Sequence, residues 1–162
     1  MNLMKAYKFP EYDTPIRAGK KACIVGGGNV AMDAARSAKR LGADVTVVYR
    51  RSFEEMPARV EESHHAKEEG INFLNLHNPV EIIGEDGWVK SVKVEKMELG
   101  EPDKSGRRRP IPTGEYEEVD FDSVIVSIGQ SPNPLIKQTN ADIDTESWGG
   151  IIINEDTTMT TK

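Results

Sequence analysis

Three consecutive glycines, residues 26–28, constrain the fold of this chain more than any other feature of its sequence. A short apolar run, residues 21–25, stops at these glycines, as a buried strand does. Helix-favouring sequence follows from residue 29 to residue 41, and Gly42 suits a helix C-terminus because glycine adopts positive φ without strain. The sequence therefore predicts a strand, a tight glycine turn and a helix in succession.

The spacing within this turn indicates a site for a dinucleotide. Gly26, Gly28 and Ala31 match the G-x-G-x-x-G/A pattern. Gly26 permits the turn out of the strand, Gly28 lets a diphosphate approach the backbone, and Ala31 allows the helix to pack closely on the sheet. The first N–H groups of the helix lack internal partners, so they can bind an anion without a lysine. The alternative is a glycine-rich turn that binds nothing.

The next expected strand, residues 44–49, ends in a pair of arginines. Sites that prefer NAD carry an acidic residue about 20 residues past the glycines, where it accepts from the ribose 2′-hydroxyl. This chain instead has Arg50 and Arg51 there, followed by the hydroxyl of Ser52. Guanidinium groups donate paired hydrogen bonds to a phosphate, and one can also stack on adenine. The strand end therefore predicts NADPH, and the alternative is a solvated arginine pair.

The last expected buried strand, residues 123–128, ends at Gly129 and Gln130. Ligands of an open parallel sheet bind outside the carboxyl ends of its strands. Gly129 would let the cofactor come close, and the amide of Gln130 could meet a carboxamide. The alternative is a simple turn.

The whole pattern predicts an α/β fold: a Rossmann-like parallel sheet with flanking helices and an inserted antiparallel β-meander. A second helix is expected from Ala58 to Glu69. Ser52 and Glu55 have capping-box spacing and would allow an earlier start, but Pro57 inside a helix would remove a hydrogen bond. The other expected elements are a strand at 71–74, antiparallel strands at 80–83, 88–95 and 116–120, and a long polar loop at 100–114.

Composition argues against several other functions. The formal net charge of −6 makes nucleic acid and anionic membranes poor default partners, and no apolar run approaches the roughly 20 residues of a membrane helix. Cys23 is the only cysteine, which excludes a disulfide within the chain and a cysteine-ligated cluster. A cytoplasmic location is the simplest expectation.

The remaining chemistry-bearing residues are interpreted as structural. His64 and His65 are adjacent and point to different faces of a helix, so they cannot chelate as an i, i+4 pair does, and His77 stands alone. No metal site is predicted. Arg107, Arg108 and Arg109 lie in the expected polar loop and are interpreted as a mobile, solvated turn, with a subunit contact as the alternative.

Four segments together resemble the small (beta) subunit of NADPH-dependent glutamate synthase: residues 26–33, 48–52, 56–58 and 128–133. Residues 3–15 are similar to related bacterial and archaeal flavoproteins, including the NADPH-side subunit of electron-bifurcating transhydrogenases. The resemblance implies an NADPH domain inserted within an FAD domain, together with an N-terminal iron–sulfur region. In such subunits hydride passes from NADPH to FAD, and iron–sulfur clusters carry the electrons onward.

The resemblance also implies roles for individual residues. It assigns the diphosphate to Gly26, Gly27, Gly28, Asn29 and Val30. It assigns the 2′-phosphate to Arg50 and Arg51, to which Ser52 could add a hydroxyl donor. It places Gly129 and Gln130 by the nicotinamide. No catalytic side chain is assigned.

This chain has no second glycine fingerprint for FAD, and residues 149–157 resemble the run that leads back to the family's flavin-binding motif. It is therefore interpreted as an excised NADPH-binding domain, residues 20–149, flanked by crossings into a missing FAD domain at residues 1–19 and 150–162. The isolated chain is expected to bind NADPH without oxidising it. Implied partners are that FAD domain and a large glutamine amidotransferase/synthase or ferredoxin-type subunit; relatives of transhydrogenase or sulfide dehydrogenase, and a non-catalytic NADPH sensor, are the alternatives.

Overall fold

The computed structural model describes residues 2–14, 19–104 and 106–161, and the chain divides into two compact units after Ile128. The first unit holds both sheets, and the second begins at Gly129. The domain boundaries expected from the sequence, at residues 19/20 and 149/150, stay a prediction. Of the two expected crossing segments, residues 1, 15–18 and 162 lie outside the described residues.

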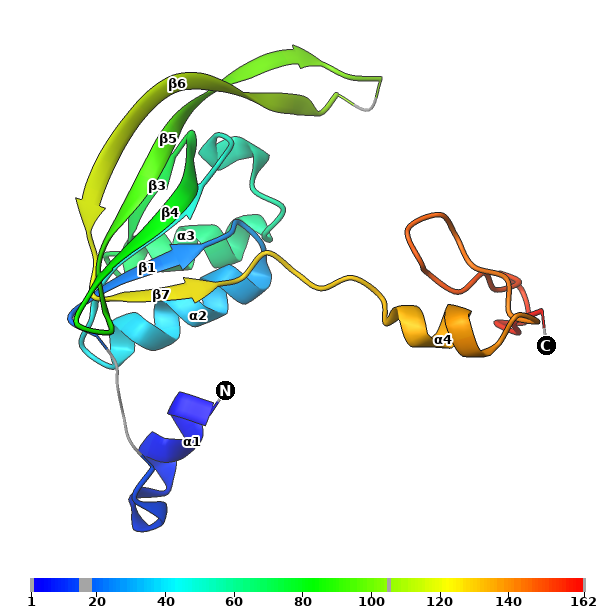
Figure 1. The fold of residues 1–162 in the computed structure, drawn as a ribbon, viewed down its shortest axis with the longest axis horizontal. Coiled ribbons are helices and arrows are strands. Elements are labelled where there is room, and N and C mark those ends of the chain that lie inside the picture. The colour runs from blue at the N-terminus through cyan, green and yellow to red at the C-terminus, as the bar shows by residue number, and fades with distance from the viewer. Residues whose placement is uncertain (1, 15–18, 105, 162) are drawn as a thin grey trace. The chain divides into compact units, whose positions relative to one another are not determined.

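A four-stranded parallel sheet forms the centre of the first unit (Figure 1). Its strands, in the order β3-β2-β1-β7, are β3 (Asn72–Asn75), β2 (Asp44–Tyr49), β1 (Lys21–Val25) and β7 (Ser123–Val126). The first two strands along the chain have the expected bounds. Strands buried on both faces are near-continuous apolar runs, and this makes β1 and β2 easy to recognise in the sequence.

Two helices cover one face of this sheet, α2 (Asn29–Arg40) and α3 (Val60–Glu68). The face of α2 that meets the sheet is built from small side chains and one methionine: Ala31, Met32, Ala35 and Ala38. The later start expected for the second helix is confirmed. Its alternative start forms instead a separate 3-10 helix, η2 (Phe53–Glu55).

Ion pairs join α2 to both ends of α3, because Glu62 lies in its first turn and Glu69 is its C-cap. Arg36 contacts the carboxylates of Glu62 at 2.7 Å and Glu69 at 2.9 Å, and Arg40 contacts Glu69 at 2.6 Å. Hydrogen bonding, first from Arg40 and then from Arg36, lowers the pKa of the Glu69 carboxyl to about 2. Both arginines of this face therefore have acidic partners.

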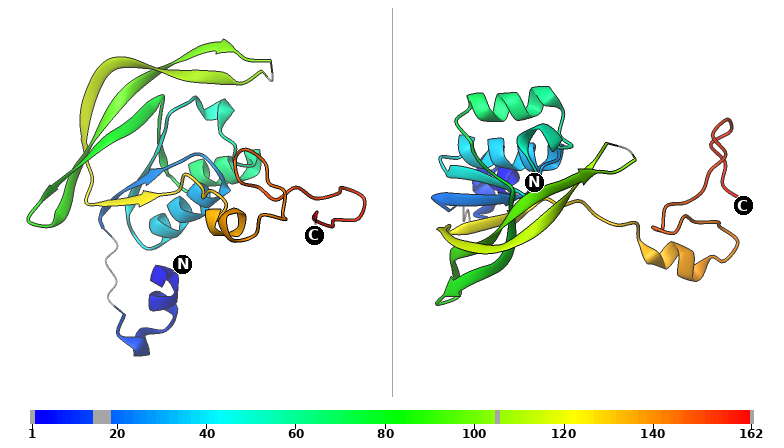
Figure 2. Two further views of the ribbon diagram at one scale, coloured as in Figure 1. Left: turned by 45° about the vertical axis from the view of Figure 1, so that its right-hand side comes forward. Right: turned by 90° about the horizontal axis from the view of Figure 1, so that it is seen from above.

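An antiparallel sheet packs on the other face of the parallel sheet (Figure 2). It contains β4 (His77–Glu85), β5 (Trp88–Pro102) and β6 (Arg108–Asp120), with β5 in the middle. Side chains from both sheets form one buried cluster between them: Cys23, Val48, Val92, Val94 and Phe121. The expected α/β fold with an inserted meander is confirmed.

The prediction of a long polar loop at residues 100–114 is wrong. β5 continues to Pro102 and β6 begins at Arg108, so that only residues 103–107 connect the two strands. Pro110 and Pro112 pair opposite Leu99 and Met97. An edge strand accommodates proline because one side of its backbone has no neighbouring strand, and β6 is an edge strand.

Short helices that the sequence pattern did not predict lie near both ends of the chain: α1 (Asn2–Lys8) and η1 (Pro10–Tyr12) before the sheet, and α4 (Pro134–Thr139) in the second unit. The Asn133 side chain caps α4 by accepting from the Leu135 N–H at 3.0 Å. Within the described residues, no helix combines the length and the apolar character that a membrane crossing requires.

Candidate functional site

The turn after β1 depends on glycine at its first position. Gly26 has a φ of 138°, and its N–H donates to the carbonyl of Val48 at 3.1 Å. A Cβ at Gly26 would overlap the carbonyl oxygen of Ser127, which follows β7. Gly26 therefore lets three neighbouring strands, β2, β1 and β7, meet at this turn.

Gly28 is different, because packing does not require it to be glycine. It is the N-cap of α2, with a φ of −92°, and a Cβ built there would meet no atom within 4 Å. The space beside its backbone is therefore open at the point where α2 begins. Asn29 and Val30 follow in the first turn with exposed side chains, and their N–H groups have no acceptor within the helix.

The segment between η2 and α3 supports the glycine turn from outside. The Ala58 N–H donates to the carbonyl of Gly27 at 3.0 Å, and the Arg59 N–H donates to the side-chain oxygen of Asn29 at 2.8 Å. The ring of Tyr49 lies where a Cβ on Gly27 would be, at 2.7 Å. The Asn29 side-chain oxygen thus positions the chain, which leaves the amide N–H groups of this residue for a ligand.

Arg50 and Arg51 follow β2 at its carboxyl end, as the sequence predicted. Arg50 is exposed, and Arg51 is half-buried. The Nε of Arg51 is buried and has no hydrogen-bond partner among the described residues. A buried donor without a partner in the protein costs free energy, so this nitrogen is available to a group that binds at the site.

Ser52 lies beside the acidic side chains of η2. Its hydroxyl is 3.5 Å from a carboxylate oxygen of Glu55. The pKa of the Glu54 carboxyl is lowered, first by its own backbone N–H and then by the Ser52 hydroxyl. Any phosphate that Ser52 binds must therefore compete with these carboxylates for the hydroxyl proton.

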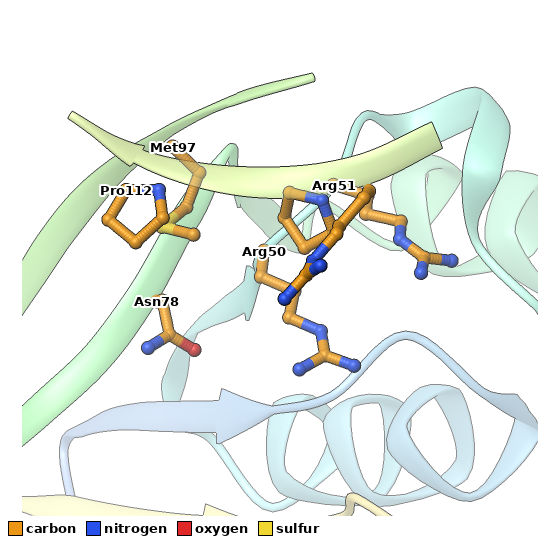
Figure 3. Close-up of a pocket in the computed structure, with 7 residues that line it drawn as sticks. Arg50, Arg51, Asn78, Met97 and Pro112 are labelled. Atoms are coloured by element: carbon orange, nitrogen blue, oxygen red, sulfur yellow. The ribbon is translucent and has the colours of Figure 1, made fainter. Parts of the chain in front are cut away.

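Both arginines line a pocket of about 440 Å³ between β2 and the meander (Figure 3). Asn78 of β4 and Met97 of β5 contribute to its wall, and Pro112 of β6 lies beside Met97. The full lining is Arg50, Arg51, Asn78, Met97, Arg109, Pro110 and Pro112. This set contains three cations, one amide and three apolar side chains, but no carboxylate.

The expected nicotinamide-side residues belong to the second unit. Gly129 has a φ of 88°, which favours glycine, and Gln130 is exposed. Their role beside the nicotinamide stays a prediction.

Cys23 and the three histidines lie in different surroundings. Cys23 is fully buried, and desolvation raises the pKa of its thiol to about 12. His64 and His65 are exposed, whereas His77 has Nδ1 at 2.7 Å from the carbonyl of Asn75 and Nε2 at 3.2 Å from Glu117. Among the described residues, His, Cys, Asp and Glu side chains form no group of three that could hold a metal ion.

Sequence reasoning missed the meander's contribution to the pocket. Arg108 and Arg109 belong to β6, so the turn expected for them is wrong, although both residues are exposed. Asn78, Met97 and Arg109 were not expected at the site, because a contact between β2 and the meander depends on how the two sheets pack. The sequence carries no local signal of that packing.

Comparison with known proteins gives a family match along the chain. The family model described as pyridine nucleotide-disulphide oxidoreductase matches residues 2–162. The beta subunit of NADP(+)-dependent formate dehydrogenase from Moorella thermoacetica is 48% identical over 119 residues, which are 72% of this chain and 17% of that protein. The glutamate synthase [NADPH] small chain of Escherichia coli K12 is 39% identical over 140 residues, 85% of this chain and 30% of that protein.

Solved structures confirm the fold. Thioredoxin reductase of T. acidophilum aligns with a TM-score of 0.70 at 20% identity, over 88% of this chain and 41% of that one. Thioredoxin reductase of Lactococcus lactis aligns with a TM-score of 0.67 at 26% identity, over 86% of this chain and 40% of that one.

The resemblance to the glutamate synthase small subunit and its relatives is confirmed by these matches. The chain spans far less than the length of its curated relatives. It covers 17% of the formate dehydrogenase subunit, 16% of the putative oxidoreductase YgfK from Escherichia coli O157:H7 and 21% of an NADPH-Fe(3+) oxidoreductase beta subunit from Geobacter sulfurreducens.

Proposed function

This chain belongs to the pyridine nucleotide-disulphide oxidoreductase family, and we propose that it binds NADPH and presents it to a flavin. One observation carries this proposal above the others. The Nε of Arg51 is buried without a partner beside Arg50, in a pocket that no carboxylate lines. A doubly charged phosphate ester supplies what that pocket lacks.

The residues present fit the cofactor in two places. The space beside Gly28 is open, and the N-terminus of α2 provides N–H donors and a positive dipole for a diphosphate. The arginine pair follows the adjacent strand, where an NAD-preferring site would have a carboxylate. Gly26, Gly27, Gly28, Asn29 and Val30 would hold the diphosphate, and Arg50, Arg51 and Ser52 the 2′-phosphate.

NADPH supplies a hydride when bound, and we propose that the groups of this chain bind and orient it. Discrimination against NADH comes from the arginines, because they bind a phosphate that NADH lacks. Gly129 and Gln130 would lie by the nicotinamide. The domain limits proposed for this task are residues 20–149, with residues 1–19 and 150–162 connecting to an FAD domain.

The experiment is a calorimetric titration of this chain with NADPH and NADH side by side. We expect tighter binding of NADPH. The double variant Arg50→Gln/Arg51→Gln should lose at least about 1.5 kcal/mol of NADPH binding, roughly tenfold, because charge-assisted hydrogen bonds are worth that much or more. NADH affinity should barely change, and equal losses for both cofactors would contradict the assignment.

We propose that electron transfer onward requires FAD and iron–sulfur clusters of the full-length protein, as in a glutamate synthase small subunit. Relatives named formate dehydrogenase subunit beta and NADPH-Fe(3+) oxidoreductase subunit beta support a place in an enzyme of several subunits. The partner would be a large glutamine-dependent synthase or a ferredoxin-type subunit, and the compartment the cytoplasm. A bifurcating transhydrogenase or a sulfide dehydrogenase relative is the second candidate within this class.

A non-catalytic NADPH sensor is the candidate of another class. The two classes differ in the fate of the bound cofactor. We expect no NADPH oxidation by the chain alone with an artificial acceptor, and oxidation when a matching flavoprotein is added. Turnover by the purified chain without any flavoprotein would contradict the proposal, and binding without turnover in the full-length protein would favour the sensor.

A further inference from the structure

We propose that the β5–β6 hairpin is part of the cofactor site, and that Arg109 of β6 is a third guanidinium for the 2′-phosphate of NADPH. This inference rests on the proposed function and extends it to a part of the chain more than 50 residues beyond the arginine pair. It makes the hairpin a determinant of cofactor choice.

The arginines of the hairpin differ in what they contact. Arg108 donates from its side chain to the carbonyl of Gly100 at 3.0 Å and to that of Leu99 at 3.2 Å, so it holds the hairpin together. Arg109 lines the pocket with Arg50 and Arg51. These neighbouring residues therefore have separate tasks, and only Arg109 is available to a ligand in this pocket.

The lining of the pocket carries an excess of positive charge. Three guanidinium groups share one pocket of about 440 Å³ that no carboxylate lines. Arg50 and Arg109 are exposed and Arg51 is half-buried, so water screens part of the repulsion between these like charges. A phosphate with nearly two negative charges would neutralise more of it. The arginines between α2 and α3 show the contrast, because both of them have carboxylate partners at 2.6–2.9 Å.

Backbone hydrogen bonds tie the hairpin to the strand end that carries the arginine pair. The carbonyl of Arg51 accepts from the Leu76 N–H at 3.0 Å, and the carbonyl of Leu76 accepts from the Met97 N–H at 2.7 Å. Leu76 has a φ of 57°, a left-handed conformation that is uncommon outside glycine and asparagine. This link fixes β5 relative to Arg51, so the pocket wall is built into the fold.

An irregularity in the pairing of β5 with β6 lies beside that link. The register between β5 and β6 shifts between Glu95 and Met97, where the single residue Lys96 of β5 lies opposite residues 113–115 of β6, so the bulge is in β6. The hydroxyl of Thr113 in β6 donates to the carbonyl of Lys96 at 3.0 Å and holds the bulge in place. Bulges of this kind redirect side chains near binding sites.

The apolar part of the pocket suits the base next to that phosphate. Met97 is 8% exposed, and it lies with Pro110 and Pro112 along the wall formed by the hairpin. Methionine and proline offer a flat apolar contact to an aromatic ring, and a guanidinium can stack on its face. The hairpin thus provides both a cation and an apolar wall for the adenosine end.

The test uses Arg109→Gln with Arg107→Gln as the matched control, since Arg107 lies on the same hairpin and is not part of the pocket lining. Calorimetry would compare NADPH and NADH, and 2′,5′-ADP with 5′-AMP, which differ only in the 2′-phosphate. We expect Arg109→Gln to weaken the binding of NADPH and of 2′,5′-ADP about tenfold, or about 1.4 kcal/mol. The affinities for NADH and 5′-AMP should change less than twofold. Arg107→Gln should leave the affinities for all four ligands unchanged.

Two results would overturn the inference. One is an NADPH affinity that is unchanged in Arg109→Gln but reduced in the Arg50/Arg51 double variant. That result would reject the role of Arg109 and leave the proposed function intact. The other is an equal loss of 2′,5′-ADP and 5′-AMP, which would place Arg109 on the base or on the 5′ end. If the double variant also kept its NADPH affinity, the proposed function itself would fail. Arg109→Lys keeps the charge but not the planar guanidinium, so its NADPH affinity should lie between those of wild type and Arg109→Gln. Unfolding curves verify that each variant is folded.

Discussion

Adding one methyl group at Gly28 should separate cofactor binding from folding. Gly28 has a φ of −92°, which any residue adopts, and a Cβ there meets no atom of the protein within 4 Å. The methyl group would instead occupy the open space beside the N-terminus of α2, where the diphosphate is proposed to approach. Gly28→Ala is therefore expected to fold normally and to bind poorly.

The expected change in stability is small because two effects oppose one another. Alanine is a poorer N-cap than glycine, by roughly 0.5–1 kcal/mol. Alanine also reduces the conformational entropy of the unfolded chain, which stabilises the native state by about 0.4–1 kcal/mol. The free energy of unfolding should stay within about 0.5 kcal/mol of wild type, a shift in Tm of only about 1–2 °C for a chain of this size.

Gly26→Ala is the matched contrast from the same turn. Its φ of 138° is unfavourable for alanine, and its Cβ would overlap the Ser127 carbonyl oxygen, which is backbone and cannot rotate away. Backbone strain and overpacking each cost about 1–3 kcal/mol, so this variant should lose about 2–6 kcal/mol of stability. It reports on the fold, whereas Gly28→Ala reports on the ligand.

Urea unfolding and calorimetry would be applied to both variants. For Gly28→Ala we expect a near-native unfolding midpoint and a loss of at least about tenfold in affinity for NADPH and for NADH alike, because the two cofactors share the diphosphate. Near-native binding of both cofactors by a folded Gly28→Ala protein would refute the reasoning. It would mean that the diphosphate lies away from the N-terminus of α2.

Two further predictions concern the dependence of stability on pH. The pKa of the Cys23 thiol rises from 9.0 to about 12 on burial, so its contribution to stability is complete below pH 9 and is lost as pH rises towards 12. Urea unfolding between pH 8 and 11 should show that the free energy of unfolding declines less steeply in Cys23→Ala than in wild type. Parallel declines in the two proteins would contradict this. The pKa of the Glu69 carboxyl falls from 4.5 to about 2 beside Arg40 and Arg36, so its contribution is present above pH 4.5 and is lost as pH falls towards 2. Glu69→Gln should therefore be less stable than wild type at pH 7, with the difference shrinking by pH 3, and a difference independent of pH would contradict the role of the ion pairs.

The sequence predicted the parallel sheet well because of how its strands are buried. Residues 21–25 and 44–49 have buried side chains facing both the helices and the meander, so they are apolar except for Lys21, Asp44 and Thr46, and they end at glycines or arginines. The tip of the β5–β6 hairpin gives the opposite signal. Its residues are mostly exposed, polar or proline, and main-chain pairing with its neighbour keeps it extended. Composition indicated a loop there because main-chain pairing leaves little trace in side-chain type.

The residues of the candidate site also divide into those that the sequence could predict and those that it could not. Gly26, Gly28 and the arginine pair could be predicted because a strand–turn–helix unit fixes their relative positions within about 25 residues of sequence. Arg109 could not, because its place depends on the bulge of β6 at residues 113–115 and on the bond between Leu76 and Met97. Neither has a sequence signature, since any residue can supply a backbone N–H.

Charge gives an independent reason for placing a ligand at this pocket. The chain has a net charge of −6, with 27 acidic side chains available to neutralise 21 basic ones. Carboxylates pair with Arg36 and Arg40 at the helix face, yet none lines the pocket that contains Arg50, Arg51 and Arg109. In so acidic a protein, three arginines in one pocket without a carboxylate remain available to another source of negative charge. The cofactor's phosphate ester is the group whose charge and geometry match them.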